Sequence, residues 1–431
     1  MTNAEYRRAP WSGVEQLLGV SLMSVLLLGC PEDPDSMGSG GSAQTGTPTT
    51  GTPTTAGTMT AAQTEGSGGS TSGSADGTGA DSSSDGGSEE SSGGDDPPVG
   101  LCPEGKDYGN PVPDGATPTL VADGFRGAEG VVWSDVEQAL FFSEIDRNKP
   151  AEVSWQDQQS GSIIRLDPSD GSHEIWVAES GTNGLALSID GQSLVAASFA
   201  TRSLLNYTLP DPVQTELVPP PARLPFNAPN DIAIRSDGTI YFTDPTWHLE
   251  GANGGMPEPG SMRVYRVSPE GDVSIVDDTL TQPNGISLSP DERTLYVTSV
   301  YPDSLAPNWT VTGYLQRFDV MDDGSTANGA LFTELQGAGP DGMAIDCAGN
   351  IYLTVTRGQE GTTPGVEIYD PDAQLLGTLT FGDPPLPASN AAFGGPDRTT
   401  LYVTVEQNNP DPAQRVFGVY GVELNIPGFP Y

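Results

Sequence analysis

Short apolar runs alternate with polar turns through most of the chain, and the alternation repeats. Each copy opens with a polar residue and continues with about four mostly apolar positions. It then breaks at a short turn rich in Asp and Gly and ends in a second run of Leu, Tyr, Phe and Val. Two short apolar runs joined by such a turn predict a β-hairpin. The six copies begin at Glu129, Asn183, Asn230, Asn284, Asp341 and Asn390.

The copies begin about 50 residues apart, which is the period of a β-propeller blade. The rest of each period has room for two more strands, such as Met262–Val267 and Val273–Asp277. No amphipathic helical stretch of useful length separates them. The pattern therefore predicts an all-β, six-bladed propeller. To close the ring, Thr119–Ala122 is expected to pair into the last blade beside Phe417–Leu424.

The composition divides the chain into three parts. Residues 31–100 are almost entirely Gly, Ser, Thr, Asp, Pro and Ala, with no Lys or Arg. Such a segment buries too little apolar surface to offset its ordering entropy, so it predicts a disordered linker. Residues 101–431 carry the apolar repeats and form the predicted propeller.

Residues 1–30 have the pattern of an export signal. Arg7 and Arg8 precede an apolar stretch that is too short for an ordinary transmembrane helix. The stretch ends in Leu-Leu-Gly before Cys30, a sequence that resembles a bacterial lipobox. Cys30 is therefore predicted to be the acylated lipid anchor of an outer-membrane or cell-surface lipoprotein, and a plain signal peptide is the alternative. A linker of this length would reach roughly 45 Å.

The net charge and the cysteines limit which binding partners and which cysteine pairing are expected. The formal net charge is −41, from 17 basic and 58 acidic residues, so a nucleic-acid partner is not expected. Contact with a membrane is expected only through the anchor, and the protein is expected to be a monomer. Besides Cys30, the chain has Cys102 and Cys347, which are either a disulfide or two free thiols.

The polar residue that opens each repeat carries a side-chain oxygen in all six copies. In a propeller each would precede the innermost strand of its blade, so the six would converge at one end of the central channel. Asn, Asp and Gly before a strand are also ordinary turn formers. Glu129 has no such turn preference, however, and all six copies agree. Carboxylate and amide oxygens without sulfur or imidazole favour Ca²⁺ or Mg²⁺.

Short segments around these positions match one known family in order and spacing. They are Glu129-Gly130 with Trp133, Ala228-Pro229-Asn230-Asp231 with Tyr241-Phe242-Thr243-Asp244-Pro245, Pro283-Asn284-Gly285 with Ser289-Pro290-Asp291, Pro340-Asp341-Gly342, and Asn390 with Phe393-Gly394-Gly395 and Leu401-Tyr402-Val403-Thr404. As a set they resemble the senescence marker protein/gluconolactonase/luciferin-regenerating enzyme family, in its bacterial gluconolactonase-like branch.

The resemblance implies a metal-dependent lactone hydrolase. One divalent ion would be held by Glu129, Asn284 and Asp341, with Asn230 beside the ion or substrate. Calcium is the first choice, and Zn²⁺, Mg²⁺ or Mn²⁺ are alternatives. The metal would polarise the carbonyl of a lactone or ester, and Asp341 would act as the general base. The predicted substrate-facing residues are Asn183, Asn227, Asn230, Trp247 and Asn390.

Two departures from the family pattern leave other functions open. Ala197 and Ser198 stand where many members carry a Glu-His pair, and Glu144 stands where Asp is usual. An insertion also occupies Ile145–Gly161. The missing Glu-His pair suggests a non-catalytic ligand-binding propeller with a structural metal ion as one alternative. A phosphotriesterase-like hydrolase that uses the same polar ring is the other.

Overall fold

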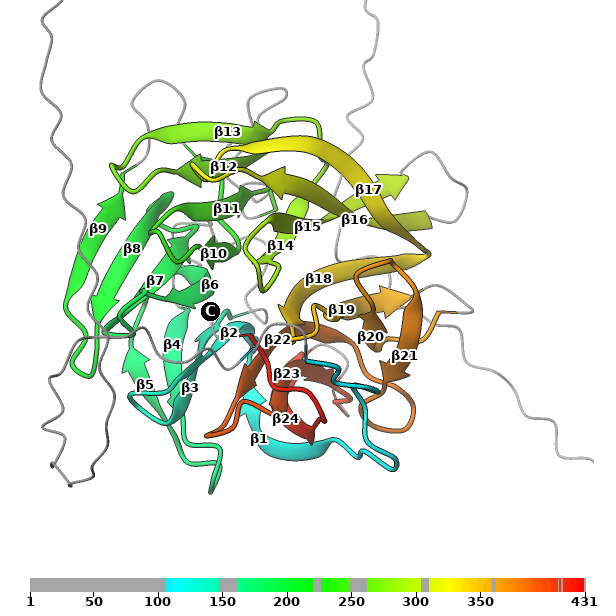
Figure 1. Ribbon diagram of the computed structural model, residues 1–431. Helices are drawn as coiled ribbons and strands as arrows, with labels where there is room; N and C mark the ends of the chain where they lie inside the picture. Colours follow the sequence, from blue (N-terminus) through cyan, green and yellow to red (C-terminus); the bar gives the residue numbers. More distant parts are fainter. Residues whose placement is uncertain are drawn as a thin grey trace, which may run out of the picture. The chain divides into compact units, whose positions relative to one another are not determined.

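The computed structural model describes residues 102, 106–146, 161–219, 226–247, 262–303, 310–358, 362–409, 411 and 414–429. The predicted signal peptide, linker and Cys30, and residues 147–160 of the predicted insertion, lie outside these ranges. The described residues form six four-stranded antiparallel sheets around a common centre (Figure 1). None of them belongs to a helix long and apolar enough to cross a membrane. The predicted six-bladed propeller is confirmed.

Each blade runs from an innermost strand to an outer strand, and blades 1 to 6 are numbered here by innermost strand. The innermost strands are β2 (Glu129–Ser134), β6 (Thr182–Leu187), β10 (Ile232–Ile234), β14 (Pro283–Leu288), β18 (Ala338–Ile345) and β22 (Ala388–Gly394). The second strands are β3 (Ala139–Glu144), β7 (Ser193–Ser198), β11 (Ile240–Asp244), β15 (Thr294–Asp303), β19 (Ile351–Gly358) and β23 (Thr400–Gln407).

The third and outer strands complete the sheets. The third strands are β4 (Ser162–Leu166), β8 (Ser203–Thr208), β12 (Arg263–Val267), β16 (Thr310–Val320), β20 (Gly365–Tyr369) and β24 (Val416–Glu423). The outer strands are β5 (His173–Val177), β9 (Gln214–Val218), β13 (Val273–Asp277), β17 (Thr326–Gln336), β21 (Leu375–Leu379) and β1 (Thr119–Phe125).

The ring is closed by the N-terminal strand β1. It pairs antiparallel with β24, from Thr119 opposite Gly421 to Phe125 opposite Phe417. The last blade therefore takes its outer strand from the beginning of the domain, as predicted. This pairing also covers the edge of β24.

The hydrophobic core lies between neighbouring blades. Phe141 and Ile163 of blade 1 pack in one cluster with Leu194 and Tyr207 of blade 2, and these four side chains are 0–1% exposed. A second cluster joins blade 6 to blade 1. Full burial of one large apolar side chain is worth roughly 1.5–3 kcal/mol. The blades are therefore held side by side by apolar contacts.

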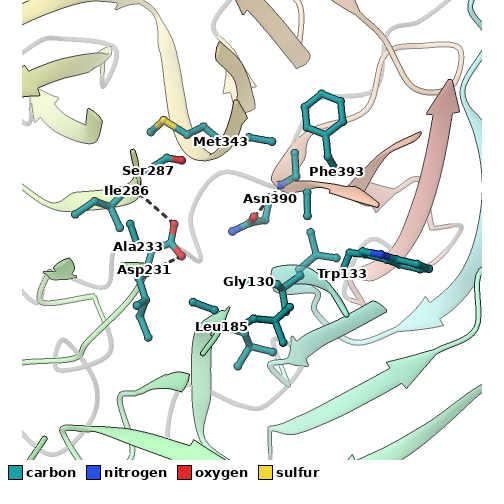
Figure 2. Close-up of a pocket in the computed structure, with 18 of the residues that line it drawn as sticks. Gly130, Trp133, Leu185, Asp231, Ala233, Ile286, Ser287, Met343, Asn390 and Phe393 are labelled. Carbon is teal, nitrogen blue, oxygen red and sulfur yellow. Dashed lines mark hydrogen bonds between the residues drawn. The ribbon is translucent and has the colours of Figure 1, made fainter. Parts of the chain in front are cut away.

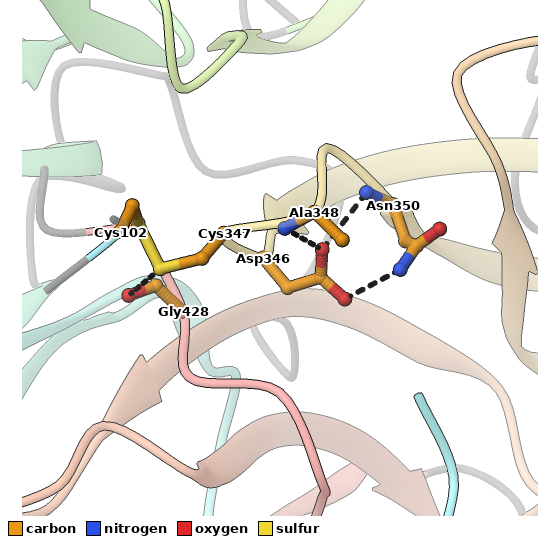
Figure 3. Close-up of a disulfide and its surroundings, with 6 residues drawn as sticks. All are labelled: Cys102, Asp346, Cys347, Ala348, Asn350 and Gly428. Atoms are coloured by element: carbon orange, nitrogen blue, oxygen red, sulfur yellow. Dashed lines mark hydrogen bonds between the residues drawn. A yellow bond between two sulfur atoms is a disulfide. The ribbon is translucent and has the colours of Figure 1, made fainter. Parts of the chain in front are cut away.

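The innermost strands begin at one end of the channel, the mouth, and end at the other, the far end. Cys347, in the far-end turn between β18 and β19, forms a disulfide with Cys102, which answers the question that the sequence left open (Figure 3). Beside it, the Asp346 carboxylate accepts hydrogen bonds from the backbone N–H and side chain of Asn350. The C-terminal segment crosses the same end, where Phe429 donates its N–H to Ile345 and lines the channel.

Candidate metal centre and active site

The second strand of each blade carries one buried hydroxyl residue at the same position in the repeat. These six residues define a common level along the channel axis. These residues are all 0% exposed and follow the aromatic or aliphatic part of the strand: Ser143, Ser198, Thr243, Thr298, Thr354 and Thr404. Sequence analysis did not identify them as a group. The signal was present, because the second run of every repeat ends in a small hydroxyl residue after two apolar ones.

The four predicted metal-binding side chains lie at the level of these hydroxyls. Glu129 pairs directly with Ser143 across β2 and β3. Asn230 and Asn284 each precede a residue whose backbone N–H donates to the threonine of the same blade. Asp341 precedes Gly342, whose carbonyl accepts from Thr354. Blades 1, 3, 4 and 5 therefore present two carboxylates and two amides at one level of the channel.

Asn183 and Asn390 lie one residue further into the channel than that level. In blade 2 it is Thr182 that pairs with Ser198. In blade 6 the N–H of Asn390 itself donates to Thr404, whereas in blades 3 and 4 the residue after the candidate ligand makes this hydrogen bond, so Ser389 takes the upper level. Asn390 consequently lines the channel cavity, as Figure 2 shows. The six repeat-opening residues thus fall into two layers.

Glycines allow the innermost strands to approach each other at the mouth. A Cβ on Gly285 would lie 2.2 Å from the carbonyl oxygen of Asp341, and one on Gly130 would lie 2.4 Å from that of Asn183. A side chain at either position would push neighbouring blades apart. The glycine that follows Glu129, Asn183, Asn284 or Asp341 therefore lets the innermost strands lie close together at the mouth.

Three of the four candidate ligand side chains are buried, and the backbone orients one of them. Glu129, Asn230 and Asn284 are 4–5% exposed, and Asp341 is half-buried. The amide nitrogen of Asn284 donates to the carbonyl of Pro340 at 3.4 Å, which leaves Oδ1 as its ligand atom.

Asp231 is a channel carboxylate that sequence analysis did not include among the candidate residues. Its two oxygens accept the N–H groups of Ile232 and Ile286 at 3.0 and 3.2 Å, so it ties β10 to β14 (Figure 2). Burial, together with the charge of Glu129, raises the pKa of Asp231 to about 7 against the effect of these two hydrogen bonds. Asp231 lies next to Asn230 in the segment that matches the family. Its role could not be predicted, because it depends on a backbone contact between two blades.

Asn227 and Trp247, two predicted substrate-facing residues, lie on loops at the mouth. Asn227 is 3% exposed, and its N–H donates to the Asp244 carboxylate at 2.8 Å. Asp244 also accepts from the N–H of Ala228, so it holds the loop that leads to Asn230. Burial raises the pKa of Asp244 to about 7. Trp247 is half-buried.

The two departures from the family pattern have structural consequences at the mouth. Ala197 is fully buried, and the Ser198 hydroxyl donates to the carbonyl of Gly181, so neither adds a polar group to a pocket wall. Glu144 accepts from the backbone N–H and guanidinium of Arg126, which also pairs with Asp146 at 2.8 Å. Glu144 is thus engaged in a local ion pair.

The donor set fits a hard divalent cation. Among the described residues, no three His, Cys, Asp or Glu side chains cluster as a metal site. A metal at this level would therefore need the amide oxygens of Asn230 and Asn284 beside the carboxylates of Glu129 and Asp341. Mixed carboxylate and amide oxygen ligands are typical of Ca²⁺.

Comparison with known proteins finds a family model and several relatives that match most of the propeller. The family model described as "SMP-30/Gluconolactonase/LRE-like region" matches residues 127–407. A gluconolactonase of Zymomonas mobilis is 31% identical over 323 residues, which cover 71% of this chain and 83% of the relative. A pentonolactonase of Haloferax volcanii is 27% identical, covering 68% of this chain and 87% of the relative. A solved structure of a Xanthomonas campestris gluconolactonase has 25% identity and a TM-score of 0.56, covering 72% and 90% of the two chains.

Proposed function

The chain belongs to the SMP-30/gluconolactonase/LRE-like family, and from that membership we propose that it hydrolyses lactones with one bound divalent metal ion. The observation that carries the proposal is the single level at which Glu129, Asn230, Asn284 and Asp341 lie. Lactone hydrolysis is the activity named for both relatives compared above. Calcium is the metal that we propose first, because all four side chains offer oxygen.

Each residue would have a defined task in this reaction. Glu129, Asn284 and Asp341 would hold the ion, with Asn230 beside it. The ion would supply Lewis-acid polarisation of the lactone carbonyl. Asp341 would take a proton from the attacking water as general base. Asn227 and Trp247 would orient the ring at the mouth, while Asn183 and Asn390 would contribute polar contacts further along the channel.

The test is hydrolysis of a panel of sugar and aliphatic lactones by the full chain with Ca²⁺, corrected for spontaneous ring opening. Asp341→Ala is expected to lose at least roughly a hundredfold in kcat, the scale of a general base. Asp322→Ala is the matched control, because that side chain is 96% exposed in the β16–β17 turn. Full activity of Asp341→Ala would refute the proposed role.

The two other functions correspond to distinct results. If Ca²⁺ raises the melting temperature but no lactone is turned over, the ion is structural and the propeller is a binding module. Turnover of phosphotriesters in preference to every lactone would identify a phosphotriesterase-like hydrolase. Both results would contradict the lactonase proposal.

We also propose that the protein is exported and anchored through Cys30. The disulfide between Cys102 and Cys347 supports this, since such bonds persist mainly in oxidising compartments. Labelled fatty acid is expected to enter the native chain but not Cys30→Ser. Equal labelling of the two proteins would contradict the anchor.

A further inference from the structure

We infer that Thr243 and Thr298 are positioning residues of the metal centre, acting through the backbone of the candidate ligands. This inference rests on the proposed function, because it concerns the same site. Both threonines lie on second strands, behind the channel wall, and neither belongs to the candidate ligand set. Both are fully buried.

Each of these hydroxyls joins two consecutive candidate ligands. Thr243 Oγ1 accepts a hydrogen bond of 3.1 Å from the backbone N–H of the residue after Asn230. It donates one of 2.6 Å to the backbone carbonyl of Asn284. Thr298 Oγ1 repeats the arrangement one blade later. It accepts a hydrogen bond of 2.7 Å from the backbone N–H of the residue after Asn284. It donates one of 3.0 Å to the backbone carbonyl of Asp341.

The two threonines thereby connect three blades in series. Asn230 is linked to Asn284 through Thr243, and Asn284 is linked to Asp341 through Thr298. Because the linked groups belong to the ligand residues or to the peptides directly after them, a shift of either hydroxyl would move a ligand side chain. Outer partners of this kind set the orientation of metal ligands and contribute to affinity.

The equivalent hydroxyl of blade 2 makes no such link. Ser198 Oγ donates to the carbonyl of Gly181 and accepts the N–H of Thr201. Neither partner adjoins a candidate ligand. Ser198 therefore has the same burial and the same strand position, but a purely structural set of contacts.

Removing the hydroxyl of Thr243 or Thr298 would leave a buried N–H and a buried carbonyl without this partner. An unsatisfied buried N–H or carbonyl is costly, so we expect the local backbone to shift until these groups form other hydrogen bonds. The ring of ligands would then lose the spacing that a metal ion requires. Replacing the hydroxyl of Ser198 would disturb the fold to a similar degree without moving the ligands.

The experiment measures Ca²⁺ binding to the full chain by calorimetry, with Thr298→Val and Thr243→Val compared with Ser198→Ala. Each substitution removes one buried hydroxyl. We expect both threonine variants to bind Ca²⁺ about tenfold more weakly or worse. Ser198→Ala should bind within about twofold of the native chain, and Thr298→Ser should regain most of the lost affinity.

The outcomes separate this inference from the proposed function. Native affinity in folded Thr298→Val and Thr243→Val would overturn the positioning role alone, as would an equal loss in Ser198→Ala. If the native chain binds no divalent cation, the proposed metal centre fails and the inference fails with it. Melting curves in chelator, recorded for every variant, establish that the proteins compared are folded, and Thr243→Val serves if Thr298→Val does not fold.

Discussion

Single buried carboxyl groups organise the mouth of the channel. Asp231 and Asp244 each accept two backbone N–H groups, and the accepted groups lie in segments that lead to or follow candidate ligands. Both have a pKa of about 7, because burial outweighs the hydrogen bonds that favour the charged form. Burying these carboxyl groups lowers the stability of the fold, while their hydrogen bonds hold the segments around the candidate ligands in place.

The raised pKa of Asp244 predicts a pH-dependent stability. An acid whose pKa is higher in the folded state stabilises the fold below its unfolded pKa, near 4, and that contribution is lost as pH rises through about 7. The native free energy of unfolding should therefore fall between about pH 4 and pH 7 and level off above that. Urea unfolding should show a smaller fall in Asp244→Asn, which cannot ionise. Parallel pH profiles for the two proteins would contradict this account.

The innermost strands determine how closely the ligands gather. Gly285 lies where a Cβ would meet the carbonyl oxygen of Asp341 at 2.2 Å and the Cα of Gly342 at 2.9 Å. Neither obstacle is a flexible side chain, so the strands themselves would have to move. The spacing between β14 and β18 is thus set by the absence of a side chain.

Gly285→Ala is expected to destabilise the protein by roughly 1–3 kcal/mol, the usual cost of overpacking, and to weaken Ca²⁺ binding. Gly377→Ala in β21 is the matched control, because nothing lies within 4 Å of a Cβ there. Chemical denaturation and calorimetry measure the two effects. Equal stability and equal Ca²⁺ affinity for the two variants would contradict the proposed role of Gly285.

The repeat could be predicted from the sequence because blade period, hairpin turns and apolar runs are local features. The same repeat marked six polar positions, and the choice of four candidate metal-binding residues among them came from the family resemblance and stays a prediction. The depth of Asn183 and Asn390 could not be predicted, because register shifts at the strand starts decide which residue faces the hydroxyl of the next strand. The roles of Asp231, Thr243 and Thr298 depend on contacts between blades, which spacing along one chain does not reveal.

At the scale of the whole molecule, the ring is closed in two ways. Strand β1 completes the last blade, and the disulfide joins Cys102 to Cys347 across a sequence separation of 245 residues. The disulfide lies at the far end of the channel, at the opposite end of β18 from Asp341. It stabilises the closed ring without contributing to the mouth.

Removing the disulfide is expected to cost about 2–5 kcal/mol of stability while sparing activity at 25 °C. Thermal melts of the native chain with and without reductant should differ by several degrees, and the double variant Cys102→Ser/Cys347→Ser should not respond to reductant. Loss of lactone turnover in the folded double variant would contradict the separation of the two ends.

The proposed lactone hydrolysis depends on a metal ion held by Glu129, Asn230, Asn284 and Asp341. The most direct measurement is the rate of lactone hydrolysis by the native chain and by Glu129→Gln as Ca²⁺ is removed with chelator and restored. We expect the native rate to fall to the spontaneous rate and to recover with Ca²⁺, and Glu129→Gln to need far more Ca²⁺ to recover. A native rate unaffected by complete chelation, or a Glu129→Gln response identical to the native one, would contradict this proposal.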